Sequence, residues 1–187
     1  MVVADPLPHL TLVSGPARSG KSRWAEHLAQ SSGQSVVYVA TGPELPNDPN
    51  WQERLRRHRE RRPSSWQLWE VGGQLSAALA RLEASQLALV DSLGTWVASH
   101  LDQDPVTWQS RVDDLLDVVV TAQAKLVLVG EECGWGVVPP TALGGLFRDR
   151  LGDLQQRLAL QAGASWLVIQ GRALPLHELA LRIPGEP

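Results

Sequence analysis

The residues with the clearest chemistry stand together near the N-terminal end, in a stretch that fits the pattern G-x-x-x-x-G-K-[ST]. This phosphate loop (residues 15–22) comprises Gly15, Pro16, Ala17, Arg18, Ser19, Gly20, Lys21 and Ser22. Its glycines let the backbone curl so that successive N–H groups point at phosphate oxygens. Lys21 would reach the β- and γ-phosphates, and the Ser22 hydroxyl would ligate Mg²⁺. The pattern therefore predicts a binding site for a nucleoside triphosphate.

A phosphate loop of this kind needs a second carboxylate near Mg²⁺, at the end of a neighbouring strand. Asp91 directly follows the apolar residues 87–90 and has the required place. We favour a metal-side role for Asp91; the alternative is a cap for a following helix over residues 93–101. Glu131 and Glu132 follow another apolar run and are expected at the same edge of the sheet.

A basic segment (residues 54–62) carries six arginines around His58 in a chain whose net charge is −3. One interpretation is a solvated helix face, and another is a nucleic-acid patch. The segment has no interleaved aromatic residue, and no second basic region exists, so we expect no nucleic-acid partner. The functional interpretation is a triphosphate clamp around a nucleophile. Neighbouring positive charges disfavour the imidazolium form, and a neutral imidazole at His58 can attack phosphorus.

The elements that position these residues alternate between strand-like and helix-like segments. Continuous apolar runs, typical of strands buried on both faces, cover residues 10–13, 36–40, 87–90, 126–129 and 166–169. Helical spacing of apolar residues covers 21–30, 74–83, 107–121 and 146–162. Loops are expected at 42–50 and 134–145, which are rich in proline or glycine. The pattern predicts an α/β fold, with a mainly parallel sheet and helices on both faces, in a single domain over residues 1–187.

Bulk composition limits the class of protein further. The chain has 187 residues, 43% of them hydrophobic and 20% charged, as in an ordinary globular protein. Its apolar runs are far shorter than the ~20 residues that span a bilayer, so no membrane span is expected. Cys133 is the sole cysteine, which excludes an internal disulfide. With no signal-peptide pattern at the N-terminus, these features predict a cytoplasmic protein.

Several stretches in one order resemble the bifunctional adenosylcobinamide kinase / adenosylcobinamide-phosphate guanylyltransferase family. Residues 15–26 are similar to the family's G-G-A-R-S-G-K-S-R-x-A-E opening, and residues 38–42 to its second strand and exit. Residues 54–66, with Arg62-Pro63 and Trp66, are similar to its R-I-x-x-H-[RK]…R-P…W segment. Residues 90–93, 134–139 and 147–152 match further family stretches. The resemblance thus runs over nearly the whole chain, and it implies the phosphate-loop NTPase fold.

The resemblance implies two reactions. Adenosylcobinamide is phosphorylated with GTP or ATP, and GMP then passes from GTP to adenosylcobinamide phosphate through a covalent adduct on the histidine that matches His58. It also implies Mg²⁺, held by Ser22 and Asp91, catalytic roles for His58 and Lys21, and a cyclic homotrimer. Beyond the phosphate loop, the family's nucleotide contacts match Ala40, Thr41, Gly42, Arg59, Glu60, Arg61, Arg62, Glu70 and Asp91.

Two departures from the family pattern bear on substrate contacts. Many relatives have Asn-Glu and Asn-Gln where this chain has Glu131-Glu132 and Gln155-Gln156.

Two alternative functions stay open. One is a phosphate-loop kinase for a small molecule without guanylyltransferase activity, in which the basic segment is incidental. The other is a non-catalytic module that senses GTP, against which the intact Lys21, Ser22 and Asp91 argue.

Overall fold

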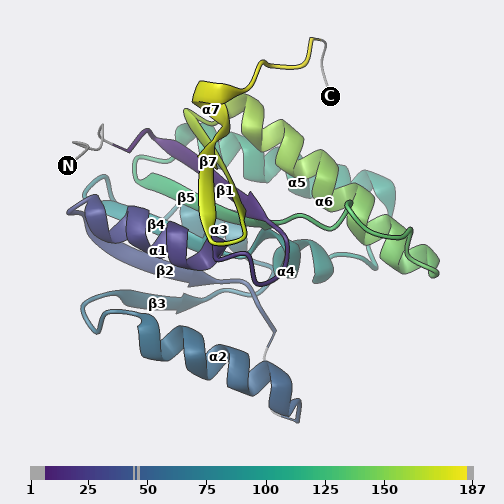
Figure 1. The fold of residues 1–187 in the computed structure, drawn as a ribbon, viewed down its shortest axis with the longest axis horizontal. Coiled ribbons are helices and arrows are strands. Elements are labelled where there is room, and N and C mark those ends of the chain that lie inside the picture. Colours follow the sequence, from purple (N-terminus) through teal and green to yellow (C-terminus); the bar gives the residue numbers. More distant parts are fainter. Residues whose placement is uncertain (1–6, 44, 46, 185–187) are drawn as a thin grey trace.

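The centre of the protein is a seven-stranded sheet with the strand order β3-β2-β4-β5-β1-β6-β7 (Figure 1). The computed structural model describes residues 7–43, 45 and 47–184, without the side chains of Trp51, Arg54, Arg57 and His58. The strands are β1 (Leu10–Gly15), β2 (Ser35–Ala40), β3 (Gln67–Glu70), β4 (Gln86–Asp91), β5 (Lys125–Glu131), β6 (Ala164–Ile169) and β7 (Arg172–Pro175). Neighbouring strands pair in parallel except β6 and β7, which are antiparallel.

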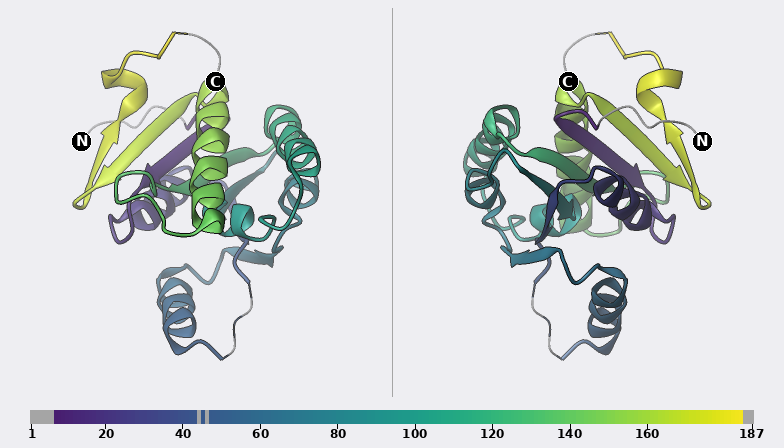
Figure 2. Two further views of the ribbon diagram at one scale, coloured as in Figure 1. Left: turned by 90° about the vertical axis from the view of Figure 1, so that its right-hand side faces the viewer. Right: turned by 90° about the vertical axis from the view of Figure 1, so that its left-hand side faces the viewer.

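Helices cover both faces of this sheet. They are α1 (Lys21–Ser31), α2 (Pro49–Arg61), α3 (Leu75–Leu79), α4 (Leu93–Ala98), α5 (Pro105–Thr121), α6 (Ala142–Gln161) and α7 (Leu176–Leu179). Helix α1 packs on one face, while buried residues of α3, α4, α5 and α6 pack on the other. Helix α2 stands away from the sheet, beyond the β3 edge (Figure 2). The predicted α/β fold, a mainly parallel sheet with helices on both faces, is confirmed.

The alternation of side chains along β5 explains why the central strands read as continuous apolar runs. Leu126 and Leu128 join the cluster formed with α3–α6, whereas Val127 and Val129 join the cluster formed with α1. Since successive side chains of a strand point to opposite faces, a strand covered by helices on both sides needs apolar residues at every position.

All five predicted strands are present, and the elements that the sequence missed lie at the edges of the fold. Strand β3 is largely exposed, and β7 is the antiparallel edge strand, so neither carries a buried apolar run. Helix α2 begins at Pro49 inside the loop predicted over residues 42–50, and proline suits a first helical position. Helix α6 likewise begins before the predicted residue 146, because Thr141 caps it by accepting from the Gly144 N–H.

One predicted helical segment is shorter in the structure than its apolar spacing indicated. Helix α3 covers only Leu75–Leu79 of the predicted residues 74–83. Within the described part of the chain, no helix combines the length and the apolar character that crossing a bilayer requires.

Candidate active site

The phosphate loop joins β1 to α1, and its geometry depends on two glycines. A Cβ on Gly15 would lie 2.3 Å from the carbonyl oxygen of Val168 in β6, so the close approach of the two strands admits only glycine. Gly20 has φ 102°, a left-handed conformation that directs the chain into α1. The loop between a buried strand and a helix is therefore built as the G-x-x-x-x-G-K-[ST] pattern predicts.

Local hydrogen bonds hold the loop in this shape. The Ser19 N–H donates to the Pro16 carbonyl at 3.2 Å, and the Gly171 N–H, from the turn between β6 and β7, donates to the Ser19 carbonyl at 3.1 Å. The Lys21 side chain folds back over the loop, with Nζ 3.5 Å from the Pro16 carbonyl oxygen. Lys21 is only 6% exposed. The single lysine of the loop is thus held against the backbone that would surround a phosphate.

Strand register gathers the other candidate residues at the same edge of the sheet. Gly15 of β1 pairs with Glu131 of β5. Ala40 of β2 pairs with Asp91 of β4 on one side and with Glu70 of β3 on the other. All of these positions are at the carboxyl ends of parallel strands, where ligands bind in open α/β sheets. The structure therefore brings Ala40, Glu70 and Asp91 to the edge that carries the phosphate loop.

Asp91 is not the cap of the next helix. The N-cap of α4 is Ser92, which leaves the Asp91 carboxylate to other partners. The Tyr38 hydroxyl, from β2, donates to Asp91 Oδ2 at 3.0 Å. The structural alternative considered for Asp91 is therefore wrong, and its carboxylate belongs to the edge of the sheet.

The Thr41 side chain has an internal role that the sequence did not indicate. Thr41 is 1% exposed, and its hydroxyl donates to the Ser92 carbonyl at 2.6 Å and accepts from the Ser92 N–H at 3.0 Å. It also lies 2.6 Å from the Thr95 hydroxyl. These contacts tie the end of β2 to the start of α4. Because the hydroxyl is already engaged, a nucleotide contact by Thr41 would have to come from its backbone.

Glu131 is a second carboxylate of this edge, beside the first residue of the phosphate loop. It accepts hydrogen bonds from the Ser92 hydroxyl and from the Gly94 N–H, the latter at 2.9 Å. A Cβ on Gly94 would lie 2.3 Å from a carboxylate oxygen of Glu131, so a larger residue there would displace the Glu131 side chain. Burial raises the pKa of Glu131 and nearby Asp91 adds to the rise, while the Ser92 hydrogen bond and the Lys21 charge oppose it.

Replacing Glu131 with glutamine is expected to flatten the dependence of stability on pH. Because the folded-state pKa of Glu131 is raised, its favourable contribution is fully present below the unfolded pKa and is lost as pH rises through the folded value. Denaturant midpoints measured from about pH 4 to about pH 8 should show the stability of Glu131→Gln increasing relative to that of the wild type as pH rises. Glu132→Gln is the matched control. Parallel profiles for wild type and Glu131→Gln would contradict this account.

Helix α2 meets the rest of the protein through its arginines. Arg59 forms an ion pair with Glu70 at the end of β3, with 3.6 Å between the charged atoms. Arg61 pairs with Glu26 of α1 at 3.1 Å. Glu60 pairs with Arg56 within the helix. The predicted contact residues on α2 thus have protein partners in this structure.

His58 lies on α2, but its side chain is outside the described part of the structure. Its helix position is one turn before Arg62, and Arg62 places its guanidinium carbon 4.7 Å from the centre of the Tyr38 ring. Since Tyr38 contacts Asp91, the end of α2 reaches the edge of the sheet that carries the candidate nucleotide residues.

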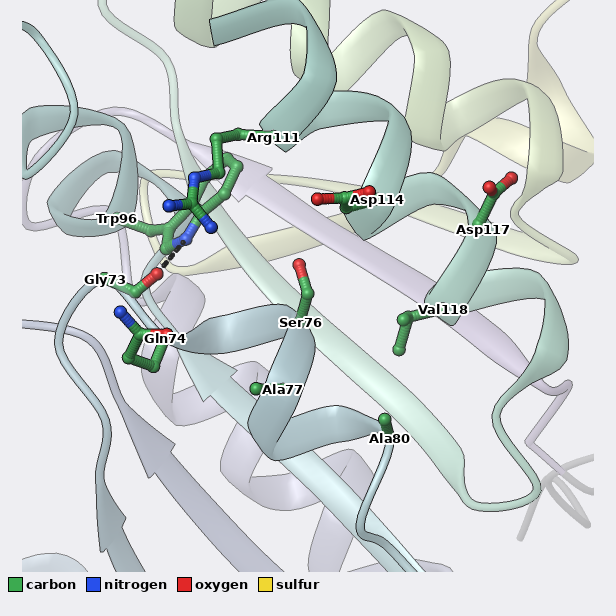
Figure 3. A pocket seen from close by; sticks show the side chains of 10 residues that line it. All are labelled: Gly73, Gln74, Ser76, Ala77, Ala80, Trp96, Arg111, Asp114, Asp117 and Val118. Atoms are coloured by element: carbon green, nitrogen blue, oxygen red, sulfur yellow. Dashed lines mark hydrogen bonds between the residues drawn. The ribbon is translucent and has the colours of Figure 1, made fainter. Parts of the chain in front are cut away.

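A separate cavity of about 370 Å³ lies on the side of the sheet that α3, α4, α5 and α6 cover (Figure 3). Residues of α3 and α5 line it, together with Gly73 and Trp96, whose indole N–H donates to the Gly73 carbonyl at 3.1 Å. Arg111, Asp114 and Asp117 form its polar wall. None of the predicted nucleotide-binding residues lines this cavity, so it is distinct from the candidate active site.

The fold and the site together define a class of protein. A glycine-rich loop with a buried lysine joins a central parallel strand to a helix, and a strand-ending aspartate lies at the same edge. This is the arrangement of phosphate-loop α/β nucleotide-binding proteins. Among the described residues, no group of three His, Cys, Asp or Glu side chains converges on a metal site.

Comparison with known proteins gives the family. Residues 11–176 match the model of the family described as "Cobinamide kinase / cobinamide phosphate guanyltransferase". The chain belongs to this family, which confirms the resemblance drawn from its motifs. A bifunctional adenosylcobalamin biosynthesis protein, CobU, of Salmonella typhimurium is 36% identical over 177 residues, which cover 87% of this chain and 96% of that protein. The CobP protein of Pseudomonas aeruginosa is 36% identical over 178 residues, covering 94% and 98%.

A solved structure supports the fold alone. The Pyrococcus horikoshii protein PH0250 aligns with a TM-score of 0.55 at 9% sequence identity, covering 94% of this chain and 91% of that one. At this identity the likeness concerns the arrangement of strands and helices.

Proposed function

We propose that this protein phosphorylates adenosylcobinamide with GTP or ATP and then transfers GMP from GTP to the product, giving adenosylcobinamide-GDP. Membership of the cobinamide kinase / guanyltransferase family over residues 11–176 supports both activities. The observation that carries the proposal is the meeting of two sets of residues at one edge of the sheet. Lys21 comes from α1 and Asp91 from the end of β4. Arg59 lies on α2, the helix that bears His58, and Arg62 directly follows that helix.

In the kinase step, the phosphate-loop N–H groups and Lys21 bind the triphosphate and stabilise charge on the transferred phosphoryl group. The Ser22 hydroxyl and the Asp91 carboxylate offer hard oxygen ligands, and Mg²⁺ is commonly bound by one or two such groups together with substrate phosphates. These two residues would hold the metal ion, which supplies charge neutralisation at the β- and γ-phosphates. The substrate hydroxyl attacks the γ-phosphorus, and the nucleoside diphosphate leaves.

In the transferase step, a neutral imidazole of His58 attacks the α-phosphorus of GTP, and pyrophosphate leaves with its bonding electrons. The phosphate of adenosylcobinamide phosphate then attacks the same phosphorus, and the histidine leaves as GMP is transferred. The arginines of α2 would bind the triphosphate and stabilise negative charge during both displacements.

We infer the remaining properties from the family resemblance and the composition. The chain would act as a single catalytic domain, in a cyclic homotrimer, in the cytoplasm. Its partners would be the two corrinoid substrates and the nucleotide, with neither nucleic acid nor membrane among them.

The proposal is tested by supplying purified protein with adenosylcobinamide, Mg²⁺ and a labelled triphosphate. A label at the γ-phosphate should appear on the corrinoid, and a label at the α-phosphate of GTP should appear in adenosylcobinamide-GDP. Transfer of the γ-label alone would favour the kinase without guanylyltransferase activity. Tight GTP binding with no transfer of either label would favour the sensing module.

A further inference from the structure

Tyr38 is the one tyrosine of the chain; it is buried and contacts one residue of each of the two sets described above, Asp91 and Arg62. It lies on β2, whose register places it beside Leu68 of β3 and Leu89 of β4. The residue is 5% exposed and packs in the core cluster on the α1 side of the sheet. Packing on several sides leaves the ring little rotational freedom, which suits a residue that orients others.

The hydroxyl of Tyr38 faces the kinase side of the site. It donates to Asp91 Oδ2 at 3.0 Å, and a hydrogen bond to an ionised carboxylate is stronger than one between neutral groups. A tyrosine hydroxyl is protonated throughout the neutral range, so the phenol is the donor in this bond and the carboxylate the acceptor.

The ring of Tyr38 faces the transferase side. The Arg62 guanidinium lies over it, 4.7 Å from the ring centre, in the range of a cation–π contact. Arg62 directly follows α2, so this contact fixes the end of the helix that carries His58. One buried side chain thus touches the carboxylate expected at Mg²⁺ and an arginine expected at the triphosphate.

We propose that Tyr38 is a positioning residue for both reactions, with its hydroxyl orienting Asp91 for phosphoryl transfer and its ring orienting Arg62 and the end of α2 for GMP transfer. The proposal rests on the function proposed above and assigns a shared support to its two steps. The two parts of the side chain can be separated, because phenylalanine removes only the hydroxyl and leucine removes the ring as well.

The test compares Tyr38→Phe and Tyr38→Leu with the wild type in both transfers. Tyr38→Phe should lower kcat for phosphorylation roughly tenfold or more, the effect of losing a hydrogen bond to a charged group, and should raise the Mg²⁺ concentration needed for half-maximal rate. Tyr38→Leu should show the same kinase defect and a further loss, in the rate at which α-labelled GTP labels the protein, beyond that of Tyr38→Phe.

Thr11→Val is the matched control, since Thr11 is also buried in the sheet and its hydroxyl has no hydrogen-bond partner among the described residues. It should leave both transfers and the Mg²⁺ dependence unchanged. A residue that only fills space would lower the melting temperature without moving the Mg²⁺ dependence, and that result for Tyr38→Phe would overturn the proposal.

The labelling comparison tests the second half separately. Equal labelling rates for Tyr38→Phe and Tyr38→Leu would overturn the assignment of the ring to Arg62. An inactive wild-type protein would instead refute the proposed function and Tyr38 with it. A fully active wild type beside an unaffected Tyr38→Phe would refute the role of Tyr38 alone.

Discussion

Replacing His58 with alanine is expected to abolish the transfer of GMP to the protein while phosphorylation of adenosylcobinamide continues. The imidazole is the proposed nucleophile, and removing a nucleophile from a covalent mechanism typically lowers the rate on the order of a thousandfold or more. The kinase step needs no covalent intermediate, because it relies on the phosphate loop and Asp91 to orient the triphosphate. The two activities should therefore separate in this variant.

The measurement is a denaturing gel of protein mixed with Mg²⁺ and GTP labelled at the α-phosphate. The wild type should give a labelled band that is acid-labile and alkali-stable, as expected for a phosphoramidate. His27→Ala is the matched control, since His27 is exposed on α1 and contacts Trp24 with a ring-centre distance of 5.3 Å. Persistent labelling of His58→Ala would show that another residue carries GMP.

Replacing Lys21 with alanine is expected to damage the kinase activity most. Lys21 is the first residue of α1, and its ammonium group lies over the phosphate loop. A hydrogen bond to a charged group contributes about 1.5–3 kcal/mol, so each lost phosphate contact should cost roughly ten- to a hundredfold in kcat/KM. Alanine has the highest helix propensity, so α1 should keep its first turn.

Steady-state phosphorylation rates and GTP binding, measured side by side, test this expectation. Lys125→Ala is a natural control, because Lys125 is the one other lysine and begins β5 at the opposite edge of the sheet. Lys21→Arg keeps the positive charge and should retain more activity than Lys21→Ala. Unchanged phosphorylation by Lys21→Ala would refute the assignment of the loop to the triphosphate.

The sequence was sufficient to predict the parts of the site that are local in the chain. The phosphate loop is one contiguous pattern between a buried strand and an amphipathic helix, and Asp91 follows an apolar run. Both could be placed at a sheet edge because the carboxyl ends of parallel strands share that edge. The five central strands could also be predicted from the sequence, since burial on two faces requires uninterrupted apolar residues.

Contacts between distant segments could not be predicted in this way. Tyr38 meets Asp91, and Thr41 meets Ser92, only because β2 pairs with β4 in one register. A shift of one residue would turn each side chain to the other face of the sheet. Likewise, an arginine-rich segment indicates a binding site for phosphate, but the pairing of Arg61 with Glu26 depends on where α2 docks.

The docking of α2 has a consequence for the way the protein responds to its solution. None of the described side chains of α2 belongs to either core cluster, and its described contacts with the other elements run through the charged groups of Arg59 and Arg61. Attraction between exposed charges, such as those of Arg59 and Glu70, is screened by dissolved ions over about 8 Å at physiological ionic strength. The pair of Arg61 with Glu26 is screened less, because the Glu26 side chain is only 14% exposed, and apolar burial is not screened in this way. Rising salt concentration should therefore weaken the contacts of α2 with the rest of the protein while the sheet stays folded. Helix α2 is thus expected to detach locally without unfolding of the core.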